Sequence, residues 1–249
     1  MPRVDRRRLF KALLAIPLAL ALHCLTLISQ PEPVPAMELL LGKVFGRITL
    51  NNNGIYLLAI ENLAFVLVFN LLYATCISEH FRYSCVYVFS RQRSRWAWYF
   101  RRVGELVLYA VLYLLLYLGC VLLVCLRCST LPLEPGDWGK FAFVFLFSLS
   151  IVVDTTLAIN LLAMRWGVTV SFFLVQGVLS SLILLAIWTC NIPWMVQLNP
   201  ISCLSLLDQG AGEQVRMAAY HVLIFAAILF GGARYVARYD IAMFDAERN

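Results

Sequence analysis

The sequence predicts an all-α membrane protein, in which residues 1–249 form a single transmembrane domain of six spanning helices. Three observations predict this fold. The chain is 62% hydrophobic and only 14% charged, a composition typical of membrane proteins and outside the range of soluble globular domains. Six apolar stretches are each long enough to cross ~30 Å of hydrocarbon as a helix. The basic residues, finally, are concentrated on alternate connections between those stretches.

The charge distribution predicts how the six helices are oriented. An even number of spans leaves both termini on one side, and fifteen of the twenty Lys and Arg residues fall on that side. Because Lys and Arg near span ends are held on the cytoplasmic side, we expect a multi-pass protein of the plasma membrane with both termini in the cytoplasm. The stretches cover about residues 9–29, 55–77, 104–126, 140–164, 168–190 and 217–236.

The largest predicted cytoplasmic loop, residues 78–103, joins the second and third spans. Its first half, "SEHFRYSCVYVFSR", can form a short amphipathic helix. Ser78 is a possible N-cap, and an acidic residue follows in the first turn, where the helix dipole favours it. The apolar members then recur at helical spacing. The helix either lies on the membrane surface or docks a cytoplasmic partner protein. Its candidate contact residues are Glu79, Phe81, Arg82, Cys85, Val88 and Phe89.

The second half of the loop, "SRQRSRWAWYFRR", interleaves arginines with aromatic rings. In a soluble protein this pattern would favour nucleic acid, because guanidinium groups pair with phosphate and rings stack on bases. The apolar composition argues against a nucleic-acid partner and favours membrane lipids. Trp and Tyr then lie at headgroup level, and the arginines contact lipid phosphates. The predicted interfacial anchor comprises Arg91, Arg93, Arg95, Trp96, Trp98, Tyr99, Arg101 and Arg102.

The connection between the fifth and sixth spans, residues 190–216, is too long for a simple turn and too apolar for a solvated loop. Pro193 and Pro200 would interrupt any helix within it. Non-helical backbone at membrane depth must be buried in protein or line water. The segment is therefore either a structure that re-enters the membrane or an amphipathic loop on the outer surface.

This layout resembles the permease subunits of ABC-2-type ABC transporters. The shared features are a basic N-terminal segment, six spans with both ends inside, and a loop between spans two and three that carries "VFSRQRSRWAWYFRR". The resemblance implies that residues 79–90 are a coupling helix seated in a cleft of an ATPase subunit. It also implies that "LNPISCLSLL" begins a re-entrant outer hairpin between spans five and six. The implied function is ATP-driven alternating access, with export of a hydrophobic or amphipathic peptide, lipid-linked molecule or drug.

The implied partners are ABC ATPase subunits and a second permease copy or paralogue. The chain itself has no Walker A motif, since "LLGKV" and "PGDWGKF" supply a Gly-Lys pair without the rest of G-x-x-x-x-G-K-[ST]. We therefore expect no cofactor on this chain, with ATP and Mg²⁺ bound to the partner ATPase.

Polar residues inside the predicted spans are the remaining candidates, because ionisable groups in hydrocarbon are costly and face protein or water. Glu61, Asn62 and Asp154 are the candidate translocation-path residues. Asp154 is either a translocation-path or proton-linked carboxylate, or a structural one that is hydrogen-bonded to neighbouring helices through Thr155, Thr156 or an amide. Glu105 follows Arg101 at i+4, which predicts an interfacial ion pair.

Two other classes of function remain open. A non-transporting membrane scaffold or sensor would use the same loop to bind a cytoplasmic protein but would need no ATPase. A membrane-embedded hydrolase would need a nucleophile with a base in reach, and neither H-E-x-x-H nor G-x-S-x-G occurs. The Cys125 and Cys128 pair in "CLRC" is weak evidence for a metal or redox site without further ligands. No catalytic or metal-binding residue is predicted.

Overall fold

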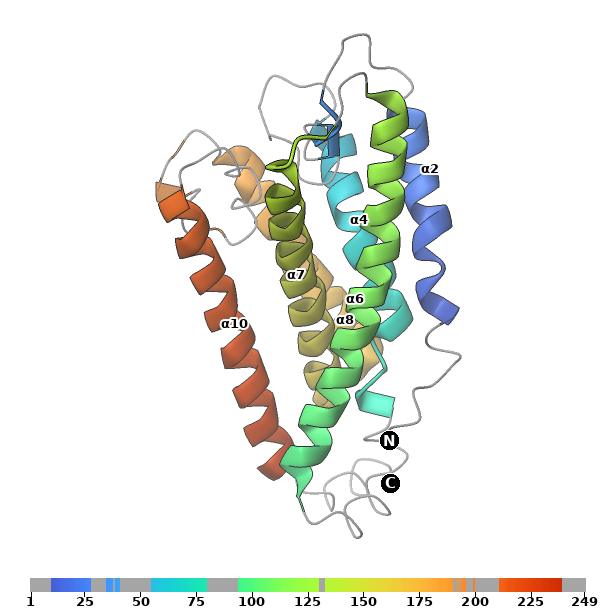
Figure 1. Cartoon of the computed structure of the whole chain (residues 1–249). Helices are drawn as coiled ribbons and strands as arrows, with labels where there is room; N and C mark the ends of the chain where they lie inside the picture. Colours follow the sequence, from blue (N-terminus) through green and yellow to red (C-terminus); the bar gives the residue numbers. More distant parts are fainter. Residues whose placement is uncertain are drawn as a thin grey trace.

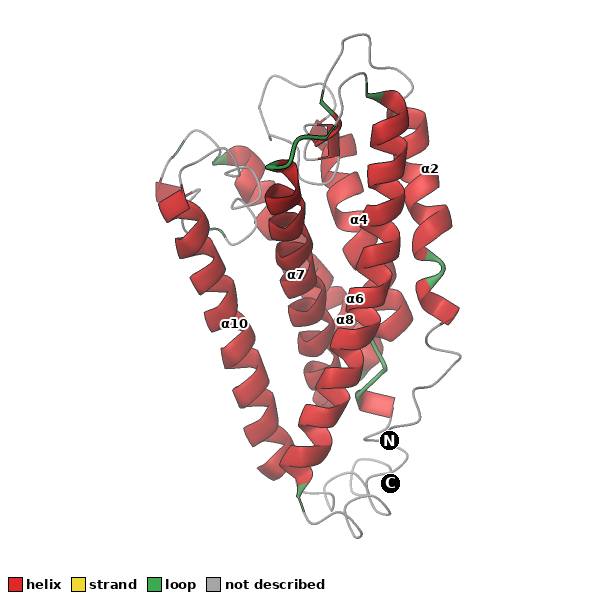
Figure 2. Ribbon diagram, viewed as in Figure 1, coloured by secondary structure: helices red, strands yellow, loops and turns green. Residues whose placement is uncertain are grey.

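The computed structural model describes residues 10–27, 35–37, 39–40, 55–79, 94–129, 133–189, 192, 194–195, 199 and 211–238. The elements over these residues are helices, packed side by side as a bundle (Figures 1 and 2). They are α2 (Ala15–Leu27), α4 (Ile55–Tyr73), α6 (Arg95–Cys128), α7 (Asp137–Trp166), α8 (Val168–Trp188) and α10 (Ala211–Arg238).

A helix lies in each of the six predicted stretches. Four segments are long and apolar enough to cross a membrane: Arg95–Cys128, Asp137–Trp166, Val168–Ala186 and Ala218–Arg238. The other two helices contribute shorter apolar segments, Phe10–Leu22 and Ala64–Tyr73. Helices of this length and composition are those of a membrane-embedded protein. Six spans with both termini in the cytoplasm stay a prediction.

The first helix is less regular than its apolar sequence suggests. A helical turn at residues 10–12 is interrupted at Leu13 and Leu14 before α2 begins at Ala15. The interruption lies four residues before Pro17, and a proline ring clashes with the carbonyl of residue i−4 while offering no N–H of its own. The helix therefore restarts where Pro17 falls in its first turn, a position that tolerates proline.

Helix α7 lies at the centre of the described bundle. It packs against α4, α6, α8 and α10, while α2 packs mainly against α6 (Figure 1). Successive helices alternate in direction, so that α6 begins and α10 ends at the same end of the bundle, called the lower end here after its place in Figure 1. Gly167 alone links α7 to α8 and has φ of 80°. Glycine adopts this left-handed conformation without steric cost, which permits the abrupt reversal.

The contact between α4 and α6 is a ladder of interleaved aromatic rings. Phe65 faces Tyr117, Phe69 faces Tyr113 and Tyr73 faces Tyr109, with ring centroids 5.4, 5.1 and 5.3 Å apart. The antiparallel helices each contribute a ring every four residues, so the rungs repeat at each helical turn. All six rings are at most 1% exposed. The hydroxyl of Tyr113 donates to the carbonyl oxygen of Phe65 at 3.0 Å, which satisfies a buried polar group.

We expect Phe69→Ala to lower the free energy of unfolding by about 1–3 kcal/mol, because Phe69 forms two aromatic pairs, with Tyr73 and Tyr113. Unfolding by SDS in mixed micelles measures the change. Leu71→Ala is the matched control, since Leu71 lies in the same helix but is 60% exposed. If both variants lost the same free energy of unfolding, the aromatic ladder would contribute nothing to stability beyond the helix propensity of its residues.

Candidate functional site

One amide side chain of α7 fixes the chain that leads into the predicted coupling helix. Helix α4 ends at Tyr73, a turn follows, and helical structure resumes at Ser78 and Glu79. Asn160 Nδ2 donates to the Tyr73 carbonyl oxygen at 3.3 Å. Asn160 Oδ1 accepts from the N–H groups of Ile77 and Ser78 at 2.8 and 3.1 Å. The fully buried amide thus satisfies backbone groups that the end of the helix leaves without intrahelical partners.

A second amide continues this polar contact between α4 and α7 one turn away. Asn70 Nδ2 donates to Thr155 Oγ1 at 3.2 Å, and Thr156 Oγ1 donates to Asn70 Oδ1 at 2.5 Å. Each threonine hydroxyl also approaches a carbonyl oxygen of its own helix, Ile151 or Val152. The sequence suggested Thr155 and Thr156 as possible hydrogen-bond partners of Asp154. The structure places both threonines against Asn70 of α4 instead.

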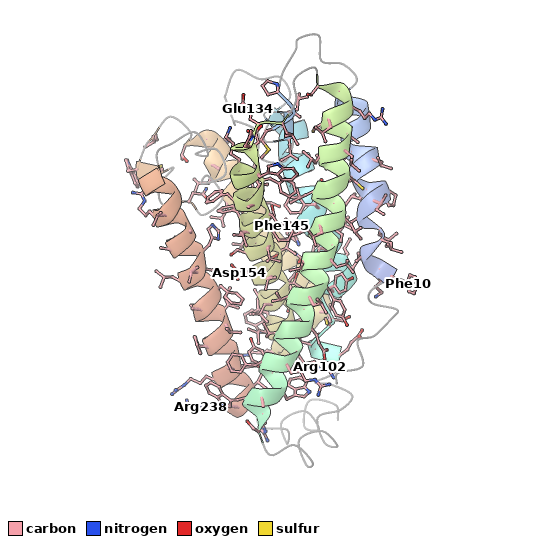
Figure 3. The ribbon with its side chains drawn as sticks, viewed as in Figure 1. Phe10, Arg102, Glu134, Phe145, Asp154 and Arg238 are labelled. Atoms are coloured by element: carbon pink, nitrogen blue, oxygen red, sulfur yellow. The ribbon has the colours of Figure 1, made fainter. Side chains whose placement is uncertain are left out.

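Asp154 belongs to a separate polar cluster on the side of α7 that faces α10 (Figure 3). Ser150 Oγ donates to Asp154 Oδ2 at 3.1 Å and lies 3.5 Å from His221 Nδ1 of α10. Asp154 and His221 are 7% and 6% exposed. Asp154 Oδ1 is buried and has no hydrogen-bond partner among the described residues. The ring of Phe147 covers the imidazole edge to face, with centroids 4.3 Å apart.

The basic-aromatic run is helical from Arg95 onward, earlier than the predicted start of the third span at residue 104. Ser94 caps it by accepting from the N–H of Ala97. Arg101 and Arg102 both pair with Glu105, at 3.6 and 2.6 Å. The predicted ion pair between Arg101 and Glu105 is confirmed. Arg102 lies at the lower end of the bundle, as does Arg238 of α10 (Figure 3).

The start of α6 also contacts the end of α10. Arg95 Nη1 donates to the Ala237 carbonyl oxygen at 3.3 Å. A Cβ placed on Gly232 of α10 would lie 2.3 Å from the Tyr99 hydroxyl and 2.7 Å from Leu161 of α7. A larger residue would therefore force the ends of the Tyr99 and Leu161 side chains to shift where α6, α7 and α10 meet.

The predicted lipid-anchor residues divide between the surface and the interior. Trp96 and Arg101 are exposed, as a lipid contact needs, whereas Trp98 and Tyr99 are 4% and 0% exposed and pack inside the bundle. The buried face of α6, which includes Leu106 and Tyr109, continues at helical spacing back to the rings of Trp98 and Tyr99. The start of α6 is therefore amphipathic.

Several predicted residues fall outside the part of the chain that the structure describes. They are Phe81, Arg82, Cys85, Val88, Phe89, Arg91 and Arg93, and the side chains of Glu61 and Asn62. Glu79 is described and exposed. Most of the predicted outer hairpin is also outside the described residues, but Asn199 within it is buried and its Nδ2 donates to the Leu182 carbonyl oxygen of α8 at 2.7 Å.

The sequence did not identify Ser150 and His221 as members of a site. Ser150 and Asp154 are four residues apart on a helix, a spacing that places them on one face and could have linked them. No signal in the sequence pairs either with His221. In the described residues no three His, Cys, Asp or Glu side chains gather as metal ligands, and Cys125 is buried while Cys128 is exposed.

Comparison of the chain with protein-family models, curated proteins and solved structures finds no match. Function is therefore inferred from the contacts of the described residues and from the layout of the spans.

We expect Asn160→Ala to lower the free energy of unfolding by about 1–3 kcal/mol, because the buried N–H groups of Ile77 and Ser78 lose this acceptor, while the Tyr73 carbonyl oxygen keeps the Cys76 N–H. SDS unfolding of the purified protein measures this loss. Ser181→Ala is the matched control, since the exposed Ser181 hydroxyl bonds only the Gly177 carbonyl oxygen of its own helix. A loss no greater than that of the control would mean that water or another group replaces the amide.

Adjacent glycines of α10 give a further test. Gly232→Ala should destabilise the protein by about 1–3 kcal/mol through steric overlap with Tyr99 and Leu161. Gly231→Ala meets nothing within 4 Å and should be neutral or stabilising, because alanine has the higher helix propensity. The thermal midpoints of the two variants in detergent provide the comparison. The close approach of α6 and α10 is refuted if both substitutions have the same effect.

Proposed function

We propose that this protein is the membrane-spanning permease subunit of an ABC transporter of the ABC-2 type. It exports a hydrophobic or amphipathic molecule across the plasma membrane by alternating access, with both of its own termini in the cytoplasm. Separate ATPase subunits bind ATP and Mg²⁺ and supply the energy, and a second permease copy or paralogue completes the pathway. The segment 79–90 is the coupling helix that the ATPase subunits move.

The observation that carries this proposal is that both ends of the loop between α4 and α6 are tied to other helices of the bundle. At one end, Asn160 of α7 holds the backbone at residues 73, 77 and 78. At the other end, Arg95 bonds the Ala237 carbonyl of α10, and Tyr99 lies against Gly232. A displacement of the loop therefore acts on α7 and α10 as well as on α4 and α6.

This arrangement supports transmission of force more than simple attachment to lipid. A lipid anchor needs exposed aromatic and basic side chains at the interface, and Trp96 with Arg101 would suffice. It does not need Asn160 or Tyr99 to be fully buried at the two ends of the loop. Hydrogen bonding makes the Asn160 attachment stiff, because a buried polar group that loses its partner costs about 1–3 kcal/mol. Tyr99 is held by packing, since its buried hydroxyl has no hydrogen-bond partner among the described residues.

The test is a pulldown of the tagged protein in mild detergent, followed by mass spectrometry and an ATPase assay. We expect an ATPase with a Walker A motif to co-purify. We also expect Phe81→Ala combined with Phe89→Ala to lose coupled transport and transport-linked ATPase stimulation while membrane insertion is retained. Phe173→Ala is the matched control, because Phe173 of α8 is 69% exposed on the bundle surface.

Two results would overturn the proposal. Folded protein that brings down no ATPase would favour the scaffold, whose loop binds another cytoplasmic protein. Transport that is unchanged in the Phe81 and Phe89 double variant would exclude segment 79–90 as the coupling helix.

A further inference from the structure

We propose that Asp154, Ser150 and His221 form a proton-binding relay between α7 and α10, in which Asp154 holds a proton that Ser150 passes to and from His221. The cluster joins two helices through side chains only, since Ser150 and Asp154 come from α7 and His221 from α10. The ligand of this site is a proton, and the site does not depend on the transport function proposed above.

The direction of the hydrogen bonds defines the relay. The single proton of the Ser150 hydroxyl is donated to Asp154 Oδ2 at 3.1 Å. The hydroxyl oxygen lies 3.5 Å from His221 Nδ1, which donates to it in the tautomer that carries the proton on Nδ1. With ionised Asp154 the chain runs from imidazole N–H to hydroxyl to carboxylate, and with the proton on Asp154 it runs in the reverse direction, from carboxylic acid to hydroxyl to imidazole nitrogen.

Proton transfer along this chain balances without another reactant. When His221 is an imidazolium, its Nδ1–H bond breaks and a new O–H bond forms on Ser150. The original Ser150 O–H bond breaks as its proton moves to the Asp154 carboxylate. The products are neutral imidazole, an unchanged serine and a carboxylic acid. The reverse sequence returns the proton to His221.

The surroundings favour the proton on Asp154. An ionised carboxylate in a low-dielectric interior needs a charged or multiply hydrogen-bonding partner. Asp154 has one described donor, Ser150, while its Oδ1 is buried without a partner. The carboxyl is 7% exposed. The neutral acid avoids the burial of a net charge at this position.

Among the side chains that the structure describes on α7 and the facing helices, none other than Ser150 has a contact that would hold the carboxylate as an anion. Helix α8 contains no ionisable residue, and α4 presents the amide of Asn70, which is engaged by Thr155 and Thr156. Glu61 lies earlier in α4. The ionisable groups of α6 are Arg95, Tyr99, Arg101, Arg102, Glu105, Tyr109, Tyr113, Tyr117, Cys120, Cys125, Arg127 and Cys128. Those of α10 are Glu213, Arg216, Tyr220, His221, Arg234, Tyr235 and Arg238, and among the described contacts His221 is the one that meets the Ser150–Asp154 pair.

Proton occupancy is coupled to the contact between α7 and α10. While Asp154 is neutral, the two helices can pack with Phe147 closed over His221. Transfer of the proton to His221 leaves a carboxylate facing an imidazolium across this contact. Loss of that proton to water then leaves a buried carboxylate without a counter-charge, which favours entry of water between α10 and α7.

The test uses the full-length protein in lipid nanodiscs without any ATPase, so its outcome is independent of the transport proposal. Infrared spectra at about pH 7 should contain a protonated carboxylic-acid band that is lost in Asp154→Asn. On transfer to D₂O, the band should shift as its proton exchanges. Ser150→Ala and His221→Gln should each slow this exchange by about tenfold, because each removes a hydrogen-bonded step.

Ser148→Ala is the matched control. Ser148 is buried in the same helix, but its hydroxyl donates to the Val144 carbonyl oxygen of α7 and does not face α10 in any described contact. Its exchange rate should equal that of the unmodified protein. Absence of an Asp154 band would show an ionised, structural carboxylate and overturn the proposal. Exchange that is equally fast in Ser150→Ala would exclude the relay. Equally fast exchange in His221→Gln gives the same decision if Ser150→Ala does not fold.

Discussion

The bundle depends on how the polar groups of α7 are satisfied in an apolar interior. In hydrocarbon an unpaired donor or acceptor cannot bond to water, so such groups are favoured to bond to a neighbouring helix or to their own backbone. Asp154 Oδ1 is the described exception on α7. Thr156 and Asn160 bond to groups of α4, and Ser150 lies against His221 of α10. These requirements fix the rotation of α7 about its axis, because the α4-facing and α10-facing residues lie on different sides of one helix.

The same hydrogen bonds tie the interior of the bundle to its lower end. Asn160 is an interior residue that organises the backbone where α4 gives way to the loop. The start of α6, which follows that loop, contacts α10 through Arg95 and Tyr99. The aromatic ladder between α4 and α6 then resists separation of the two helices that flank the loop. A partner bound to the loop would thus act on a stiff four-helix unit made of α4, α6, α7 and α10.

Hydropathy and length predicted that helices would lie in all six apolar stretches, because a chain of this composition must satisfy its backbone internally in a membrane. The errors at the boundaries have local causes. Pro17 breaks the helical turn that precedes α2, and α6 begins at Arg95 because the basic-aromatic run has a buried helical face, with Trp98 and Tyr99 in the interior. Hydropathy averages over a window, so it misses both a single proline and an amphipathic extension rich in arginine.

Of the candidate site, the sequence by itself determined the unusual residues: Asp154 as a carboxylate inside a span, and the ion pair of Glu105 with Arg101, which depends on i,i+4 spacing alone. Only the tertiary structure decided their partners. The contacts of Ser150 with His221, Asn160 with the end of α4, and Tyr99 with Gly232 join residues more than seventy positions apart. Spacing along one helix specifies which side chains share a face, whereas the helix that covers that face is set by the packing of the whole bundle.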